Sequence, residues 1–340
     1  SATTEYSCTV KNNISSVNVN ATATSSKSKV RGLGAKDLVE GKNTLPIRVI
    51  AEDGSEKIYN INITRKAGAS SLKNKIMKNS VITANPTLTT SSNNTSDASG
   101  LYKSTATNTG EATYYFRGNV TNNYVSFAGQ TWRIVRVNED GTIRIVMQDG
   151  INSNANITFN SNYNNYTYMY YTNSQAKTTL ESWYQTNIGS KKDLASSVAS
   201  GAYYCEQAKA KQSNSYTSGS ATMTTYNKYT PDFKCIADGN GKGVVNASVG
   251  LLSYDEVVYA GGYYNQSNSN YYLNNPAISW WTMSPAGFSG SYSSVWCVGT
   301  SGVVDFDFVN NSLRLRAVLN LNADTLVTGD GTSSDPFVVS

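Results

Sequence analysis

Four cysteines are the residues of this sequence best suited to nucleophilic, redox or metal chemistry: Cys8, Cys205, Cys235 and Cys297. The chain contains no histidine, which excludes Ser-His-Asp and Cys-His catalysis, histidine-ligated zinc and a histidine pH switch. The cysteines form no CxxC pair and lack the spacing of a zinc tetrad. The sequence therefore argues against a zinc site and against the commonest forms of nucleophilic catalysis.

Cys205 and Cys235 have two interpretations that the sequence does not separate. A disulfide between them closes a loop of roughly 30 residues and stabilises the fold by about 3 to 4 kcal/mol in the chain-entropy model. Such a bond requires an oxidising compartment. Two reduced, buried thiols are the alternative. Cys8 and Cys297 are expected to lie in different domains and to be unpaired.

Asp255 and Glu256 belong to the sequence SYDEVVYAGG, which predicts a short helix. Ser253 is placed to cap its N-terminus, and Gly261 with Gly262 to end it. Carboxylates in the first turn of a helix are stabilised by the helix dipole. We therefore attribute this pair to helix electrostatics rather than to catalysis.

Calcium is the one metal that the Asp and Asn oxygens of this sequence could still bind. Asp238, Asn240 and Asp255 are candidates for a structural site, which we hold as a minor alternative to no cofactor at all. No EPN- or QPD-like tripeptide lies near the tryptophans, so calcium-dependent sugar binding is not expected.

The composition describes a globular chain of 340 residues, long enough for two domains. No apolar run approaches the length of about 18 residues that spans a bilayer, so we expect no membrane insertion. The net charge of +5 is spread over the chain and gives no dense basic patch of the kind that binds nucleic acid. We therefore expect no nucleic-acid partner.

The segment from Trp280 to Arg316 holds three of the five tryptophans in a run otherwise rich in Gly, Ser, Asn, Tyr and Phe. Small polar residues mixed with aromatics are typical of contact surfaces. The same residues also fill the core of an ordinary hairpin. The composition alone leaves both interpretations open.

The elements that would carry these residues begin with a β domain. The sequence GKNTLPIRVIAEDGSEKIYNINITR predicts two strands around a turn at Asp53 and Gly54. It resembles the cadherin-like, immunoglobulin-type β-sandwich repeat of bacterial surface proteins, which serves there as a spacer. We expect this domain at residues 1–67 and a linker at 68–71.

The second domain, at residues 72–340, is expected to be α+β within a mainly β chain. Leu72, Ile76 and Met77 mark a short basic helix, and a Ser/Thr/Asn-rich loop follows. The helical spacing of Leu180, Trp183, Tyr184 and Ile188 predicts a second helix, which Ser174 caps and Gly189 ends. The expected core residues of the strands are Tyr115, Val125, Phe127, Trp132, Ile134, Val137, Ile143 and Ile145.

The motifs TYYFRGNVTNNYVSFAGQTWRIVRVNEDGTIRIV, GLLSYDEVVYAGG, WWTMSP, RAVLNLN and GDGTSSDPFVV resemble a large family of surface proteins from Gram-positive gut bacteria. The resemblance implies a C-type-lectin-like fold, related to formylglycine-generating enzymes and to the variable proteins of diversity-generating retroelements. In such proteins a tryptophan-rich frame supports displayed, variable residues.

The resemblance carries over to particular residues. It implies a frame of Trp280, Trp281, Met283, Ser284, Pro285 and Arg316. It implies a displayed ligand-binding set of Phe288, Ser289, Ser291, Tyr292, Trp296, Asp305, Asp307 and Asn310. The family often has Pro after the arginine of the penultimate strand, where this sequence has Ala317.

The function that follows is an adhesin-like binding module on the surface of a Gram-positive-type bacterium. The β-sandwich would space a lectin-like head whose partner is a protein or glycan on another cell or on a phage or host surface. A structural subunit of a surface assembly is the alternative. A formylglycine-generating-type enzyme is disfavoured, because Cys297 has no nearby cysteine in sequence and no histidine to lower its pKa.

Overall fold

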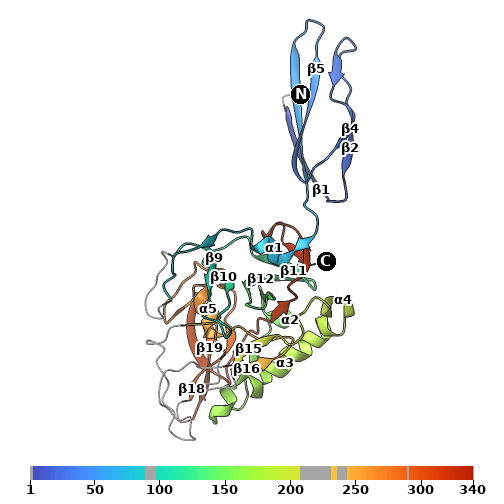
Figure 1. Ribbon diagram of the computed structural model, residues 1–340. Coiled ribbons are helices and arrows are strands. Elements are labelled where there is room, and N and C mark those ends of the chain that lie inside the picture. Colours follow the sequence, from blue (N-terminus) through green and yellow to red (C-terminus); the bar gives the residue numbers. More distant parts are fainter. Residues whose placement is uncertain (1–2, 89–96, 207–230, 236–242, 289–290, 340) are drawn as a thin grey trace. The chain divides into compact units, whose positions relative to one another are not determined.

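The computed structural model describes residues 3–88, 97–206, 231–235, 243–288 and 291–339 (Figure 1). Within these residues the protein is mainly β, as predicted, with an N-terminal β-sandwich. The chain divides into two compact units, Ser1–Ser70 and Ser71–Ser340.

The N-terminal unit is a sandwich of a four-stranded and a two-stranded sheet. The four-stranded sheet has the order β1-β6-β5-β3, and β2 pairs with β4. The predicted turn at Asp53 and Gly54 is confirmed, because it joins two long antiparallel strands and Gly54 has a φ of 84°, which glycine adopts without strain. The strands are β1 Glu5–Val10, β2 Ser16–Val19, β3 Lys29–Arg31, β4 Gly34–Asp37, β5 Gly41–Ile50 and β6 Glu56–Arg65.

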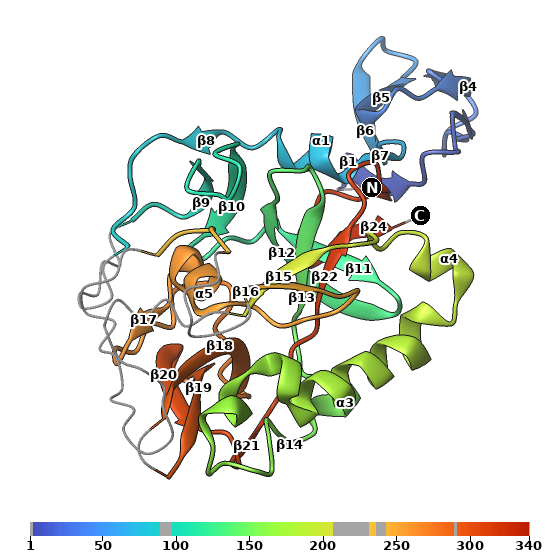
Figure 2. The same cartoon turned by 60° about the horizontal axis from the view of Figure 1, so that its bottom comes forward.

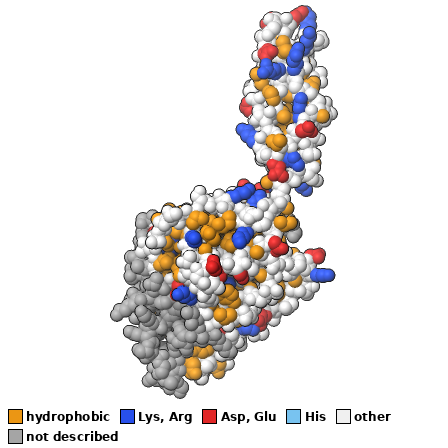
Figure 3. Space-filling view, in the orientation of Figure 1, with side chains coloured by type: hydrophobic (Ala, Val, Ile, Leu, Met, Phe, Trp, Pro, Cys, Tyr) orange, Lys and Arg blue, Asp and Glu red, His pale blue; other side chains and the backbone are white. Residues whose placement is uncertain are grey.

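The core of this unit is small and lies between the sheets. Val19, Leu38, Ile47 and Ile63 are its buried hydrophobic residues. On the face that Figure 3 shows, basic and acidic side chains are interspersed over the unit. This face of the unit therefore carries no large patch of a single charge.

The second unit is built on a large sheet. Its path is β7-β23-β24-β11-β12-β10-β9-β8, and β13 joins β12 to β22. All eight core residues that the sequence predicted lie in these strands and are at most 3% exposed. The strands are β7 Ser70–Ser71, β8 Val81–Ile82, β9 Gly100–Ser104, β10 Thr113–Arg117, β11 Tyr124–Phe127, β12 Gln130–Val137, β13 Ile143–Met147, β22 Val318–Leu321, β23 Leu326–Thr328 and β24 Phe337–Val339.

A four-stranded sheet of order β17-β20-β19-β18 contains most of the tryptophan-rich segment. Figure 2 shows this sheet on the side of the unit where β14 and β21 lie. Two further pairs, β14 with β21 and β15 with β16, complete the strands among the described residues. Their bounds are β14 Ile157–Thr158, β15 Tyr203–Glu206, β16 Gly243–Asn246, β17 Tyr263–Tyr264, β18 Trp280–Phe288, β19 Ser293–Val298, β20 Val303–Phe308 and β21 Ser312–Leu313.

The helices are short, and their ends follow the predicted signals. Ser174 accepts a hydrogen bond from the backbone of Lys177 and caps α3, while Ser253 and Glu256 form a capping box on α5. Among the described residues, no helix is both long and apolar enough to cross a membrane. The helices are α1 Leu72–Ile76, α2 Ile151–Asn154, η1 Tyr166–Met169, η2 Tyr171–Asn173, α3 Gln175–Tyr184, η3 Gln185–Gly189, α4 Lys192–Ala195 and α5 Tyr254–Ala260.

The structure decides between the two interpretations of Cys205 and Cys235, because it joins them in a disulfide. The bond ties β15 to the segment that carries Phe233. The Phe233 ring stacks on Tyr259 of α5 at 4.0 Å between centroids. Cys8 is free and exposed, whereas the other free cysteine is buried. The prediction that both are unpaired is thus confirmed.

We expect the double variant Cys205→Ser/Cys235→Ser to lower the free energy of unfolding of the second unit by about 2 to 5 kcal/mol, because the closed loop restricts the unfolded chain. Urea denaturation followed by tryptophan fluorescence reports on this unit alone, since every tryptophan lies in it. Cys8→Ser is the control and should leave the transition in place. An unchanged midpoint in the double variant would show that the bond contributes no stability.

Candidate functional site

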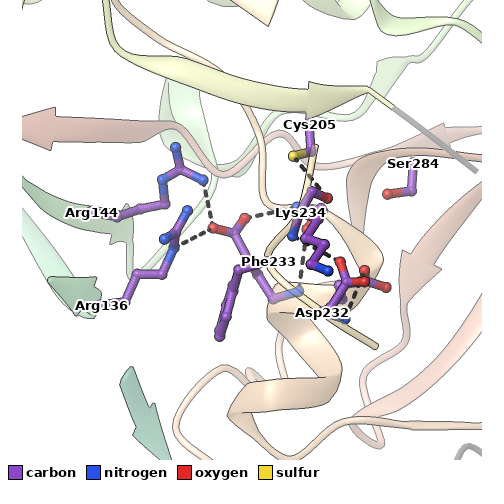
Figure 4. Close-up of a pocket in the computed structure, with 10 residues that line it drawn as sticks. Arg136, Arg144, Cys205, Asp232, Phe233, Lys234 and Ser284 are labelled. Carbon is purple, nitrogen blue, oxygen red and sulfur yellow. Dashed lines mark hydrogen bonds and ion pairs between the residues drawn. The ribbon is translucent and has the colours of Figure 1, made fainter. Parts of the chain in front are cut away.

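The first candidate is a cluster of buried charges around Glu256 in the first turn of α5. Its Oε1 accepts hydrogen bonds from Arg144 Nη1 at 2.5 Å and Arg136 Nε at 3.2 Å. Its Oε2 accepts from the backbone N–H of Ser253 at 3.0 Å. Figure 4 shows the two arginines converging on one carboxylate from the large sheet. One helix residue is thereby fixed to two adjacent strands, β12 and β13.

The electrostatics of this cluster keep its groups charged. Burial acts to raise the pKa of the Glu256 carboxyl, but the charges of Arg144 and Arg136 outweigh it and hold that pKa below its usual value. The Arg136 guanidinium also pairs with Glu139 at 3.3 Å. Each charged group is therefore bound by another member of the cluster.

The space beside these charges is too small for a substrate. The cavity that Arg136, Arg144, Asp232, Asp255 and their neighbours line measures about 10 Å³, which is room for roughly one water molecule. We conclude that this cluster holds the fold together. The interpretation of Glu256 and its neighbour as helix-capping rather than catalytic carboxylates agrees with this geometry.

The minor calcium prediction falls largely outside the described residues, because Asp238 and Asn240 lie there. Asp255 is 6% exposed, and its carboxylate accepts a long hydrogen bond of 3.4 Å from the backbone N–H of Asp232. Within the described ranges, no group of three or more Cys, Asp or Glu residues is arranged to hold a metal ion.

The second candidate is the segment from Trp280 to Arg316. Every member of its predicted frame is buried. Arg316 donates hydrogen bonds of 2.8 Å to the carbonyls of Met147 and Leu273, and its guanidinium lies 4.8 Å over the Trp280 ring. Trp281 donates to the carbonyl of Ile157 at 3.1 Å. The frame therefore connects the second sheet to the rest of the unit.

Two residues of the predicted displayed set are not displayed. Phe288 is 3% exposed and Trp296 2% exposed, so the expectation that they form an open contact surface is wrong. Trp296 lies in an aromatic cluster, with ring centroids 4.7 Å from Tyr254 and 5.2 Å from Tyr264. For this tryptophan the alternative of an aromatic core residue is correct. Ser289 lies outside the described residues.

The remaining displayed set is divided by the register of the sheet. Cys297 pairs with Asp305 and Val295 with Asp307, and residues directly opposite in an antiparallel pair share a face. Because side chains alternate along a strand, Phe308 points to the other face. The two aspartates and the exposed end of β20 thus belong to different surfaces.

An exposed row of aromatic rings lies next to the predicted loop, and we call it the aromatic platform: Tyr163, Tyr292 and Phe308. Tyr292 and Phe308 are each 39% exposed, and Tyr163 is half-buried. The Tyr163 and Tyr292 rings are stacked at 4.9 Å with 9° between their planes. Phe308 continues the row at 4.8 Å from Tyr292. Tyr292 is the member of this platform that the sequence identified.

Backbone contacts hold the platform in register. Ser293 directly follows Tyr292, and its backbone N–H donates to the carbonyl of Tyr163 at 2.8 Å. Its hydroxyl donates to the carbonyl of Asn165 at 2.5 Å. Ser293 is fully buried, so these bonds are shielded from water. The start of β19 is therefore pinned to the segment that carries the first ring.

Ser291 and Asn310 are exposed, as expected of the displayed set. Asp305 and Asp307 are half-buried, and Asp307 accepts a hydrogen bond of 2.6 Å from Asn311. Whether any of these side chains contacts a ligand stays a prediction. Tyr163 and Phe308 were missed because no local pattern marks them, although Tyr163 lies in an Asn- and Tyr-rich stretch.

Cys297 is poorly suited to nucleophilic chemistry. It is 7% exposed, and burial raises the pKa of its thiol well above the usual range, with further contributions from Asp307 and Asp305. Thiolates rather than thiols attack electrophiles. The neighbouring carboxylates therefore oppose the ionisation that a catalytic cysteine requires.

We expect Glu256→Gln to destabilise the second unit by about 3 to 5 kcal/mol, because it removes the carboxylate that pairs with buried Arg144 and one of the two that pair with Arg136. The folded pKa of Glu256 lies below that of an unfolded glutamate, about 4.3. Its contribution is therefore complete above that pH and is lost as the pH falls through the folded pKa. Urea denaturation should show the difference from wild type shrinking at acid pH.

The matched control is Glu181→Gln, which removes an exposed pair with Lys177 and should change stability by at most about 0.5 kcal/mol. Equal effects of the two substitutions would contradict the structural role of Glu256.

Alkylation distinguishes the two free cysteines. At about pH 8, iodoacetamide should label exposed Cys8 and leave Cys297 unmodified until the protein is unfolded, because attack requires an accessible thiolate. Peptide mapping by mass spectrometry measures both sites in one sample. Rapid labelling of native Cys297 would reopen a reactive role.

Comparison with known proteins bears on the N-terminal unit. Residues 1–66 match the family model of the cadherin-like beta sandwich domain, which supports the predicted immunoglobulin-type repeat. No curated protein and no solved structure matches the chain. Cadherin-like domains are typically extracellular, and this is consistent with a surface location.

Proposed function

We propose that this chain is an adhesin-like binding module of a bacterial cell surface, and that the aromatic platform is its ligand-contact face. The observation that carries the proposal is the exposure of Tyr292 and Phe308, whose ring centroids lie 4.8 Å apart. Large rings lose little conformational entropy on binding and provide much contact area. An exposed row of them is costly to keep in water without a partner.

The rigidity of the surrounding structure supports the same conclusion. The platform lies beside a sheet whose β18 and β19 residues are buried throughout their described length. Binding residues on a rigid scaffold need little ordering when the ligand arrives. The buried bonds of Ser293 provide this support directly behind Tyr292.

The scaffold in this proposal is C-type-lectin-like, on the resemblance of the tryptophan-rich motifs, and its relation to retroelement-diversified proteins rests on the same motifs. The ligand is a protein or glycan on another cell or on a phage or host surface. The N-terminal β-sandwich acts as a spacer. A Gram-positive-type cell surface is the location that the resemblance implies.

A non-catalytic role belongs to this proposal. The chain has no histidine, the Cys297 thiol is buried and its pKa is raised, and the charges around Glu256 are bound to one another. These features favour binding over a formylglycine-generating type of chemistry, which needs an accessible reactive cysteine.

The test compares binding of the labelled chain to intact bacterial and epithelial cells, measured by flow cytometry. Tyr292→Ala and Phe308→Ala should each weaken binding by about tenfold or more, as loss of a central aromatic contact does. Tyr6→Ala is the control, because Tyr6 is 46% exposed but lies in the spacer. Unfolding curves must show that the platform variants remain folded.

Binding that survives both platform substitutions would overturn the site. A chain that binds no cell but self-associates in sedimentation velocity would favour the alternative of a subunit in a surface assembly.

A further inference from the structure

We infer that the chain forms a two-fold dimer through the outer edge of β1, locked by a disulfide that joins Cys8 of one subunit to Cys8 of the partner subunit. The surface belongs to the N-terminal unit and not to the aromatic platform, so the inference goes beyond the proposed function. The open edge of the strand, the order of side chains along it and the exposed thiol at its centre each indicate a second copy of this chain as the partner.

The outer edge of β1 carries backbone groups that can bind another strand. β1 is an end strand of the four-stranded sheet and, among the described residues, pairs only with β6. The carbonyls of Thr4 and Val10 accept hydrogen bonds of 2.8 and 3.0 Å from backbone N–H groups in β6 and directly after it. Successive residues of a strand direct their N–H and C=O groups to opposite edges, so those of Ser7 and Thr9 point away from β6. Such an edge is a template for a further strand.

The order of side chains along β1 is self-complementary. In an antiparallel pairing centred on Cys8, Ser7 lies opposite Thr9 of the partner subunit, and Glu5 lies opposite Lys11 of the partner subunit. The two-fold axis repeats both pairs, so the interface contains two acid–base pairs and places no like charges opposite each other. Opposite charges at facing positions stabilise a pair of strands, whereas like charges destabilise it.

The acid of this pair is held in position on its own strand. Glu5 Oε1 accepts a hydrogen bond of 2.6 Å from Asn60, and its Oε2 accepts one of 2.8 Å from Asn62. The side-chain amides of Asn60 and Asn62, with the charge of Lys42, hold the pKa of the Glu5 carboxyl below its usual value. Each oxygen of a carboxylate can accept a second hydrogen bond. The ionised group is therefore ready to receive Lys11 of the partner subunit.

Cys8 lies where a disulfide between strands fits. Because Ser7 and Thr9 supply the hydrogen bonds of this register, the two Cys8 residues form a non-hydrogen-bonded pair. The Cα atoms of such a pair lie about 4.5 Å apart, within the range of roughly 4.4 to 6.8 Å that disulfides span.

The state of the four cysteines supports a bond between subunits. Cys8 is free and exposed, whereas Cys205 and Cys235 are joined in a disulfide. Disulfides form and persist in oxidising compartments. An exposed thiol that has no partner within the chain is suited there to intermolecular pairing.

The bond forms by two exchanges with a low-molecular-weight disulfide. The Cys8 thiolate attacks one sulfur of the small disulfide and releases a small thiolate. The Cys8 thiolate of the partner subunit then attacks the Cys8 sulfur of this mixed disulfide and releases the second small thiolate. Two protein thiols are oxidised, and the small disulfide is reduced to two thiols that take up the two protons.

The test starts from the full chain with Cys8 reduced, adds oxidised glutathione at about pH 8 and follows the product by non-reducing gel electrophoresis. We expect a covalent dimer of twice the chain mass of 36.7 kDa, and peptide mapping should find Cys8 joined to Cys8. Cys8→Ser should remain monomeric on the gel. A wild-type chain that also remains monomeric overturns the inference.

Moving the thiol by one position tests the register. Cys8→Ser/Thr9→Cys keeps an exposed thiol on β1, but position 9 lies opposite Ser7 of the partner subunit. The covalent dimer should therefore form at least about tenfold more slowly than in wild type. Equal rates would show that exposed thiols react by random collision, which overturns the inference.

Exchanging the two charges tests the complementarity of the edge. Lys11→Glu places like charges opposite each other twice and should slow dimer formation by about fivefold or more. The double variant Glu5→Lys/Lys11→Glu restores the pairs and should recover the wild-type rate to within about threefold. Lys27→Glu is the matched control, because it makes the same change in net charge at an exposed residue outside β1. A double variant as slow as Lys11→Glu contradicts the proposed register.

Hydrogen exchange reports on the strand pairing separately from the disulfide. The N–H groups of Ser7 and Thr9 become donors to the partner subunit, so the peptide covering residues 4–11 should exchange at least about tenfold more slowly in the oxidised dimer than in Cys8→Ser. Peptides of the second unit should exchange alike in both samples. Unchanged exchange of residues 4–11 would mean a disulfide without a strand interface, and the inference would then be wrong.

Discussion

The second unit depends on one buried carboxylate. Glu256 binds Arg136 and Arg144 of the large sheet from its place at the start of α5, and this fixes the helix to that sheet. The next contacts lead to the second sheet: the backbone N–H of Tyr254 donates to Ser284 Oγ in β18 at 2.9 Å, and the Tyr254 ring packs on Trp296 in β19. The ion pairs of this one carboxylate therefore link the two sheets through one short helix, beside the contacts of the frame.

Buried Arg117 likewise pairs with a carboxylate, that of Asp97 at 2.8 Å, whereas Arg133 and Arg316 are accommodated by other groups. Arg133 lies 3.9 Å over the Tyr124 ring and donates to Asn123 Oδ1. Burial, followed by the nearby charge of Arg133, lowers the pKa of Arg316 to about 10, which still leaves it protonated at neutral pH. Carbonyl oxygens and aromatic faces thus replace anions around these guanidinium groups. This use of rings explains why so many aromatic residues of the unit are internal.

The sequence predicted features that local physics determines. The turn at Gly54, the caps Ser174 and Ser253, and the apolar core residues of β12 and β13 all follow from patterns within a few residues. The exposure of an aromatic residue on a strand does not follow from such local patterns, because exposure depends on which other element covers that face of the strand. The family resemblance implied a displayed Trp296, whereas the fold covers it with Tyr254 and Tyr264.

The contact between Tyr163 and Tyr292 illustrates the same limit over a longer distance. Tyr163 follows β14, which pairs with β21 at Ile157 and Leu313, and Tyr292 precedes β19, so the two rings come from segments far apart in the chain. No period or composition within either segment indicates that register. The stacked pair was therefore out of reach of sequence reasoning, although each segment separately is rich in Tyr, Asn and Ser.

The buried frame and the exposed rings are held by different contacts, so substitutions at the exposed positions need not disturb the frame. Ser293, the first residue of β19, is held by hydrogen bonds to backbone carbonyls of the facing segment, and these bonds do not depend on the side chains of that segment. The identities of Ser291, Tyr292 and Asn310 do not enter those bonds. Substitution at these positions thus alters the contact surface while the frame of Trp280, Trp281 and Arg316 stays intact. Surface substitutions away from such buried contacts cost little stability, so the exposed positions can vary more freely than the frame.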